Sequence, residues 1–550
     1  MVMIDTSAKT ASLSKVSQAY ITLLTLVAAI GGLLFGYDTA VVNGAEKSLV
    51  AFYITPITDP SHADYAVRMI SQYKLLLIVV LFLVGIVICA QLIRLLGARK
   101  GGIISIILLA VLGFWAASFA GRSISYLPGD LQDTANAIKG FVIASALIGC
   151  VIGGAAAGFI SKSLGRKNGL VISAICFFIS AIGAWRPESF NFFGTLDAYS
   201  FVIYRIIGGV GVGIASMISP MYIAEIAPAN MRGRLVSFNQ LAIIFGMLVI
   251  YFVNYFIAKQ GNEQWLITEG WRWMFFSGVI PAGIFFILLF FVPETPRYLA
   301  MKGKDEKAIR VLKRIAGESD ASATLNDIKA TLHEKNAPWL SYGYFLIFIG
   351  ILLSVFQQFV GINVVLYYAS NIFRNMGSST DSSLLQTIIV GVVNLLFTVV
   401  AILTVDKFGR KPLMVIGSIG MGISMFALGL AFYFNELGIA ALIFMLTYTA
   451  AFAMSWGPVC WVLLAEIFPN SIRGALSIAV AAQWIANWVV SLTFPMMNDN
   501  QWLTAKFNHG FSYWIYGVMG ILSAIFVWKL VPETKGKTLE QIEQLWGKRG

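Results

Sequence analysis

The stretch EIAPANMRG, Glu225–Gly233, returns 241 residues later as EIFPNSIRG, Glu466–Gly474. Both copies keep a glutamate, a proline three residues further on and a final Arg-Gly pair. Two further motifs repeat in the same order at nearly the same offset: SLGRK from Ser163 with KFGRK from Lys407, and VPETPRYL from Val292 with VPETKGKTL from Val531. Ordered matches at one offset indicate that the chain consists of two homologous halves.

The composition predicts that these halves lie in a membrane. Of the 550 residues, 58% are hydrophobic and only 12% are charged. Uncharged runs such as Leu75–Ile93 and Gly101–Gly121 are long enough to cross a hydrocarbon core about 30 Å thick as helices. The predicted fold class is therefore an all-α polytopic membrane protein. Parallel repeats in such proteins place a substrate site near the bilayer midplane, between the halves.

The first helix breaks the regular offset between the halves. GYD at Gly36–Asp38 best matches GIN at Gly361–Asn363, at an offset of 325 against 244 for SLGRK. The 81 additional residues in the first half contain the two uncharged runs named above, with basic residues between them. We therefore expect an inserted helical hairpin and about 14 transmembrane helices, twelve in the core and two in the insert.

The expected domain organisation follows from the repeat and the insert. The segments are the first helix of the N-terminal bundle (1–42), the insert (43–138), the rest of the N-terminal bundle (139–293), a cytoplasmic helical linker (294–341), the C-terminal bundle (342–533) and a cytoplasmic tail (534–550). Within the linker, KDEKAIRVLKRIAG is typical of a short amphipathic helix, although a solvated linker remains an alternative.

Charge placement predicts the orientation. The chain carries a net charge of +12, and its basic connections alternate with acidic ones. By the positive-inside rule, the basic set and both termini are cytoplasmic, in a cell (inner) membrane. We therefore do not expect a nucleic-acid partner. The four cysteines and three histidines show no ligand spacing, so we expect no disulfide, no metal and no cofactor.

Asp38 lies in the apolar stretch GGLLFGYDTAVV, where an ionised carboxylate costs roughly 2.5–3.5 kcal/mol. Arg205 is the cation well inside the apolar part of the same half. A nearby arginine would keep the carboxylate ionised, and its withdrawal would favour protonation. The two residues predict a protonation switch coupled to helix position; a static buried ion pair is the alternative.

The second half offers amides instead of charges. Gln357, Gln358 and Asn363 would point in different directions on a straight helix, but a break at Gly361 would let them converge. Gln483 and nearby tryptophans add further donors, acceptors and flat apolar faces. This combination favours a neutral polyol as ligand, although amides also join helices to one another.

An enzyme has little support. GGVGVG from Gly208 lacks the spacing of a dinucleotide-binding loop, and close helix packing explains it better. The chain offers no nucleophile–base pair, so we expect a protein that is not an enzyme.

Several motifs together resemble those of the sugar porter branch of the major facilitator superfamily. They are GYD from Gly36, QQFVGINVVLYYA from Gln357, both Glu-x-x-Pro-x-x-x-Arg-Gly motifs, GRK in each half, PETPRYL and VPETKGK. The resemblance covers nearly all of the chain except the insert. It implies the major facilitator fold, with two six-helix bundles that open alternately to either side of a central sugar pocket. Facilitative members tend to carry asparagine in place of Asp38, so the carboxylate favours proton coupling.

The resemblance also implies roles for individual residues. The implied sugar contacts are Gln240, Gln357, Gln358, Asn363, Trp461, Gln483 and Trp484, with Phe35 and Tyr367 lining the pocket. The implied proton acceptor is Asp38, with Arg205 as its partner. The implied charge network that closes the cytoplasmic gate consists of Glu225, Arg232, Glu466, Arg473, Arg166 and Arg410.

The chain departs from the family pattern at several positions. Ala475 directly follows Gly474, where members of the family have a basic residue between them; this deletion would turn the next helix by about 100° unless the loop absorbs it. Met247 stands where a pentose-carrying member has a pocket glutamine, which leaves the choice between pentose and hexose open. Lys162 replaces the acidic residue of the usual loop in the first half.

These observations predict a proton-coupled monosaccharide importer that works by alternating access. Its partners would be a monosaccharide, protons and the lipid bilayer, and it would be a monomer. A facilitative sugar uniporter and a transporter-like sugar sensor remain the alternatives.

Overall fold

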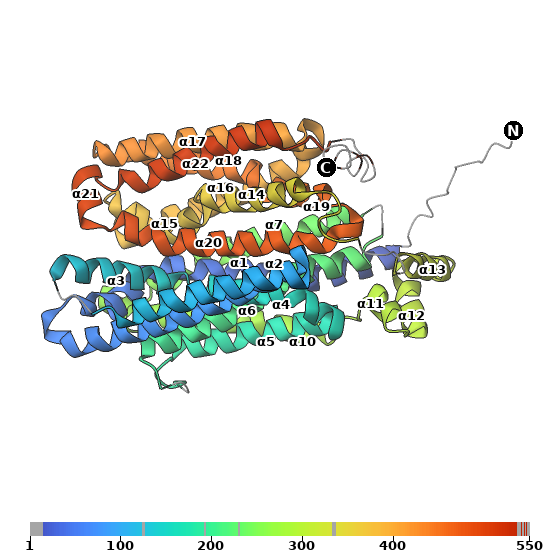
Figure 1. The fold of residues 1–550 in the computed structure, drawn as a ribbon, viewed down its shortest axis with the longest axis horizontal. Helices are drawn as coiled ribbons and strands as arrows, with labels where there is room; N and C mark the ends of the chain where they lie inside the picture. Colours follow the sequence, from blue (N-terminus) through green and yellow to red (C-terminus); the bar gives the residue numbers. More distant parts are fainter. Residues whose placement is uncertain are drawn as a thin grey trace.

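A computed structural model describes residues 15–123, 127–191, 194–228, 231–332 and 337–535, together with residues 541, 544 and 546. Within these ranges the chain is helical and contains no strand. The two sequence halves form two helical bundles that lie side by side along their length (Figure 1). This confirms the predicted all-α architecture of two matched halves.

The N-terminal half contains ten helices of the described chain. They are α1 (Lys15–Leu49), α2 (Ala63–Gly121), α3 (Pro128–Ile143), α4 (Ser145–Ser163), α5 (Arg166–Trp185), α6 (Asp197–Ile226), α7 (Arg232–Ala258), α8 (Glu263–Trp265), α9 (Trp271–Phe276) and α10 (Val279–Leu289). Glycines bring α4 and α6 together: a Cβ atom on Gly209 would lie 1.8 Å from the Ala146 carbonyl oxygen. The glycine-rich stretch therefore serves helix packing, as predicted.

The C-terminal half repeats the pattern. Its helices are α14 (Tyr344–Phe359), α15 (Ile362–Asn375), α16 (Thr380–Phe408), α17 (Arg410–Tyr433), α18 (Ile439–Met454), α19 (Trp456–Ile467), α20 (Leu476–Asn498), α21 (Gln501–Phe507) and α22 (Gly510–Leu530). Gly361, in the left-handed conformation with φ +94°, separates α14 from α15, which confirms the predicted break. A second break, between α18 and α19, lies at Ser455, and Pro458 fits into the first turn of α19.

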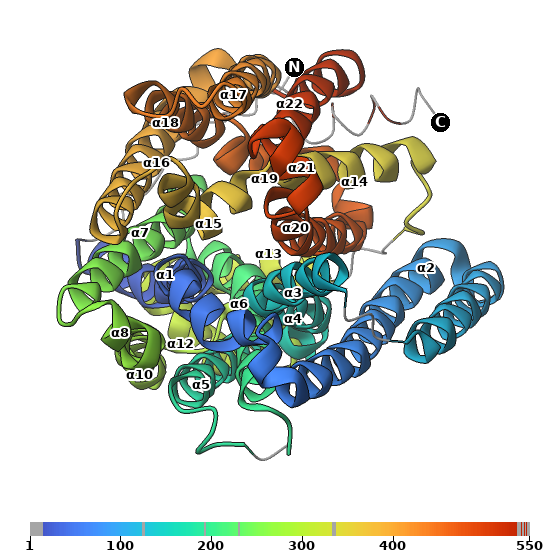
Figure 2. The same ribbon diagram turned by 90° about the vertical axis from the view of Figure 1, so that its left-hand side faces the viewer.

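The insert forms the predicted hairpin. Gly97, with φ +80°, reverses the chain inside α2. The hydroxyl of Ser105 donates to the Cys89 carbonyl at 3.4 Å, and Lys74 donates to the carbonyl of Arg122, so the two arms are antiparallel. The described residues contain 13 helical stretches able to cross a membrane, and one of them, Pro60–Gly121, contains both arms. The hairpin lies at the edge of the bundles, beside α3 and α20 (Figure 2).

Three short helices follow α10: α11 (Pro296–Met301), α12 (Asp305–Ile315) and α13 (Ala321–Leu332). They share a small core that includes Leu299, Leu312 and Leu325. The predicted amphipathic helix is thus present as α12. We call the end of the bundles that carries these helices the linker end, and the opposite end the far end (Figure 1).

Candidate functional site

The repeated sequence motifs build the same charge cluster twice. In the first half, Arg166 Nη2 donates to Glu225 Oε1 at 2.8 Å, and the Thr295 hydroxyl donates to Glu225 Oε2 at 2.6 Å. In the second half, Arg410, Glu466 and Thr534 make the corresponding contacts at 2.9 and 2.6 Å. The sequence repeat is therefore also a repeat of side-chain geometry at the linker end.

These ion pairs each lie within one half. Glu294 accepts hydrogen bonds from the backbone N–H groups of Arg166 and Lys167 at the start of α5, while burial raises the pKa of its carboxyl. Arg232 donates to the carbonyls of Ala224 and Ala227. The side chain of Arg473 lies outside the described residues. Closure of a gate by this network remains a prediction.

Asp38 on α1 and Arg205 on α6 form the ion pair that the sequence predicts. Arg205 Nη1 donates to Asp38 Oδ1 at 2.8 Å, and Nη2 donates to the backbone carbonyl of Asp38 at 2.8 Å. The guanidinium also lies over the Phe275 ring, 5.1 Å from its centroid. Asp38 Oδ2 has no hydrogen-bond partner among the described residues, and it borders a small cavity shared with Ser180. One carboxylate oxygen is thus held and the other is free to take a proton.

Four of the predicted amides form one hydrogen-bonded chain. Asn363 donates to Gln358, Gln358 donates to Gln357 Oε1 at 3.4 Å, and Gln483 donates to the same Gln357 oxygen. Gln357 in turn donates to the Trp456 carbonyl at 3.0 Å. The turn at Gly361 places Asn363 within reach of α14, as predicted. Each of the four amides is at least nine-tenths buried. The C-terminal half therefore contains a connected set of buried hydrogen-bond donors and acceptors.

An aromatic contact joins the two halves at the residue that follows Gln483. Phe35 of α1 lies against Trp484 of α20, with ring centroids 5.5 Å apart. Tyr367 is buried on α15.

Two predicted sugar contacts lie outside the amide chain. Gln240 and Trp461 are half-buried, and the structure places neither of them in that chain. Met247 is buried on α7.

The deletion before Ala475 does not rotate α20 away from the site. Residues Asn470–Ala475 form a short turn with non-helical dihedral angles at Ile472. Gln483 and Trp484 on α20 still meet Gln357 and Phe35. The loop therefore leaves Gln483 and Trp484 directed at Gln357 and Phe35, and a deletion at this point stays a prediction.

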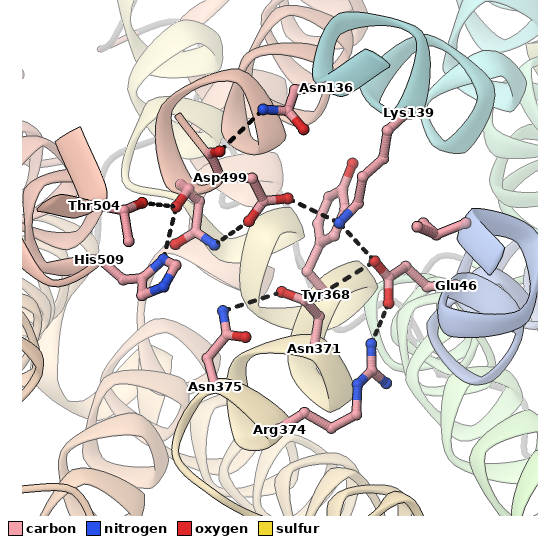
Figure 3. A network of polar contacts seen from close by, with 12 residues as sticks. Glu46, Asn136, Lys139, Tyr368, Asn371, Arg374, Asn375, Asp499, Thr504 and His509 are labelled. Carbon is pink, nitrogen blue, oxygen red and sulfur yellow. Dashed lines mark hydrogen bonds and ion pairs between the residues drawn. The ribbon is translucent and has the colours of Figure 1, made fainter. Parts of the chain in front are cut away.

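One polar cluster was missed by the sequence analysis. Glu46, Lys139, Arg374 and Asp499 meet at the far end, between the halves (Figure 3). The available signal was the position of Glu46 near the end of an apolar helix and of Lys139 at the start of the apolar stretch that continues into α4. Nothing in their spacing indicated that they meet residues of the other half.

Comparison with known proteins identifies the family of the chain. The family model described as "Sugar (and other) transporter" matches residues 24–128 and 125–546. The chain belongs to this family. As a sugar transporter family member with many membrane-spanning helices, it is a multi-pass membrane protein.

Individual family members match over almost the whole chain. The D-xylose-proton symporter of Escherichia coli K12 is 51% identical over 96% of this chain and 96% of its own length. The glucose facilitated diffusion protein of Zymomonas mobilis is 37% identical over 97% of this chain and 99% of its own. The solved structure of the inward open conformation of the Escherichia coli xylose transporter XylE is 49% identical, with a TM-score of 0.74 over 96% and 100% of the two chains. Transporters of this family therefore share both the sequence and the fold of this chain.

Proposed function

We propose that the chain is a proton-coupled monosaccharide importer that works by alternating access. The observation that carries this proposal is the position of two residues on α1. Asp38, which pairs with Arg205, lies three residues after Phe35, which contacts Trp484 of the other half. Residues three apart share one face of a helix. A movement of α1 that follows protonation would therefore reach the ligand side of the interface directly.

The proposed ligand is a neutral sugar, either a pentose or a hexose. Amides donate and accept at once, as hydroxyl groups do, and the face of Trp484 offers apolar area for the C–H face of a sugar ring. The amide chain from Asn363 to Gln483 contains no charged side chain. Sugar hydroxyls would replace these amide–amide hydrogen bonds upon binding.

Protonation of Asp38 would release Arg205 and make movement of α1 possible. One charge that crosses about 100 mV releases about 2.3 kcal/mol. Because 1.36 kcal/mol corresponds to a factor of ten, this energy supports roughly 50-fold accumulation before any pH gradient is added.

The proposed orientation places the linker end in the cytoplasm. The basic residues of the repeated motifs and of α11–α13 gather at that end, and the positive-inside rule assigns it to the cytoplasmic side. Both termini would then be cytoplasmic, in the inner membrane, and the protein would act as a monomer surrounded by lipid.

A facilitative uniporter is the second candidate, because a relative with 37% identity is named a facilitated diffusion protein. The substitution Asp38→Asn distinguishes the two. We expect the variant to lose accumulation of labelled sugar in energised vesicles but to keep sugar exchange, because asparagine imitates the protonated carboxyl. Glu436→Gln, at an exposed loop position, is the matched control. Equal accumulation by Asp38→Asn and the control would refute the coupling role.

A further inference from the structure

Four charged residues from both halves meet at the far end of the molecule (Figure 3). Glu46 and Lys139 belong to the N-terminal half, whereas Arg374 and Asp499 belong to the C-terminal half. Lys139 Nζ lies 2.9 Å from Glu46 Oε1 and 2.9 Å from Asp499 Oδ2, and Arg374 Nη2 lies 2.5 Å from Glu46 Oε2. The charges therefore alternate in sign along one connected chain.

The cluster is largely withdrawn from solvent. The side chains of Glu46 and Lys139 are 1% and 8% exposed, and those of Arg374 and Asp499 are 18% and 25% exposed. Neighbouring amides complete the bonding: Asn371 donates to Glu46 at 3.2 Å, and Asn136 donates to the Asp499 carbonyl at 3.0 Å. Buried charges of this kind are tolerated when they are paired and hydrogen-bonded.

Other contacts show that the halves are closed against each other here. Asn43 of α1 donates to the Leu366 carbonyl at 2.9 Å and accepts from the Ser370 hydroxyl, through its own carbonyl, at 2.7 Å. Gly140 of α3 packs on α20 so tightly that a Cβ atom would lie 2.2 Å from the Leu492 carbonyl oxygen. Any opening of the far end must break these contacts together with the ionic cluster.

We propose that Glu46, Lys139, Arg374 and Asp499 form a latch that sets how often the far end opens. This proposal rests on the alternating access of the proposed function. Opening would break the two pairs that cross between the halves, Glu46–Arg374 and Lys139–Asp499. The Glu46–Lys139 pair would remain within the N-terminal half, so that half would open without leaving either charge alone.

The latch predicts that single and double substitutions change the open fraction of the far end by unequal amounts. Glu46→Gln removes one anion and leaves Lys139 and Arg374 buried with Asp499 as the remaining anion of the cluster. Removal of one partner from a buried pair is strongly unfavourable, whereas removal of both is much less so. Lys139 keeps its pair with Asp499, but Arg374 loses its ion-pair partner. Water around an open far end would relieve this unpaired cation, so the single variant should open more often and the double variant Glu46→Gln/Arg374→Gln should largely close again.

Spin labels on Gly129→Cys and Gln501→Cys, both exposed at the far end, report this opening as a distance in the full chain. We expect the long-distance population to rise about tenfold in Glu46→Gln and to return to within about threefold of the parent in the double variant. Asp381→Asn is the matched control, because the exposed Lys259–Asp381 pair also crosses between the halves. It should leave the distribution unchanged.

The second crossing pair gives an independent test should Glu46→Gln not fold. Asp499→Asn, at the more exposed member, should shift the same distances in the same direction, and Lys139→Gln/Asp499→Asn should reverse the shift. Distance distributions identical to the parent in the single variants, or single and double shifts that simply add, would overturn the latch. The distance measurement uses neither sugar nor a proton gradient. A negative result for the latch is therefore distinguishable from a negative result for proton-coupled sugar transport.

Discussion

Gln357 is the residue at which the amide chain branches. It accepts from both Gln358 and Gln483 and donates to the Trp456 carbonyl. A ligand hydroxyl that enters the chain would therefore meet a group already held in place from three sides. This preorganisation makes Gln357 the most informative single residue of the proposed sugar site.

Substitution of Gln357 by alanine should weaken sugar binding. The change removes hydrogen bonds worth about 1 kcal/mol each and leaves Gln483 without its partner, so we expect the Kd to rise about tenfold with expression unchanged. Titration of tryptophan fluorescence with sugar measures this. Gln386→Ala is the control, since Gln386 bonds to Ser378 outside the chain of amides. An unchanged Kd for Gln357→Ala would remove it from the site.

For single residues, the sequence predicted a contact where an ionisable residue lay in an apolar stretch. The meeting of Asp38 and Arg205 followed from two ionisable groups in apolar helices of one half. The far-end latch could not be predicted, because its charges lie near helix ends where lysine and arginine side chains can also reach water. Which turns of separate helices meet depends on tertiary packing, which one sequence does not reveal.

Among the elements, the turn between α14 and α15 requires a glycine for two reasons. Gly361 has φ +94°, and a Cβ atom there would lie 2.7 Å from Cγ of the Tyr516 ring. The turn positions Asn363 beside Gln358 and so completes the amide chain. Any side chain at this position must strain the backbone and displace an aromatic ring.

Gly361→Ala should therefore lower both the thermal stability and the sugar affinity. The left-handed conformation alone costs a non-glycine residue about 1–2 kcal/mol, and the overlap with Tyr516 adds to it. Gly377→Ala separates these effects, because Gly377 has φ +90° but open space around its Cβ position. We expect a larger loss of Tm in Gly361→Ala. Equal losses in the two variants would show that contact with Tyr516 is unimportant.

Element boundaries were less predictable than element existence. The inserted hairpin and the helix within the linker are present as predicted. The next core helix was expected from residue 139, but helix α3 already begins at Pro128, since proline fits the first turn of a helix. Hydrophobicity alone does not mark such a start, because Gly129–Asp133 is polar.

For the whole molecule, the repeat predicted two matched halves, and the duplicated charge clusters at the linker end show how far the match extends. The conformation could not be predicted, because one sequence must support every state of an alternating-access cycle. The structure is closed at the far end through the latch, and α1 carries both the proposed proton acceptor Asp38 and Phe35, which is proposed to line the sugar pocket. One helix would therefore serve both proton coupling and sugar binding.

The most direct test measures proton movement during sugar uptake. Proteoliposomes without a membrane potential, in weak buffer, receive monosaccharide outside while a pH electrode follows the medium and labelled sugar is counted. We predict that the medium becomes alkaline as sugar enters, with about one proton per sugar, and that Asp38→Asn abolishes the pH change. Sugar entry with a silent electrode would contradict the account.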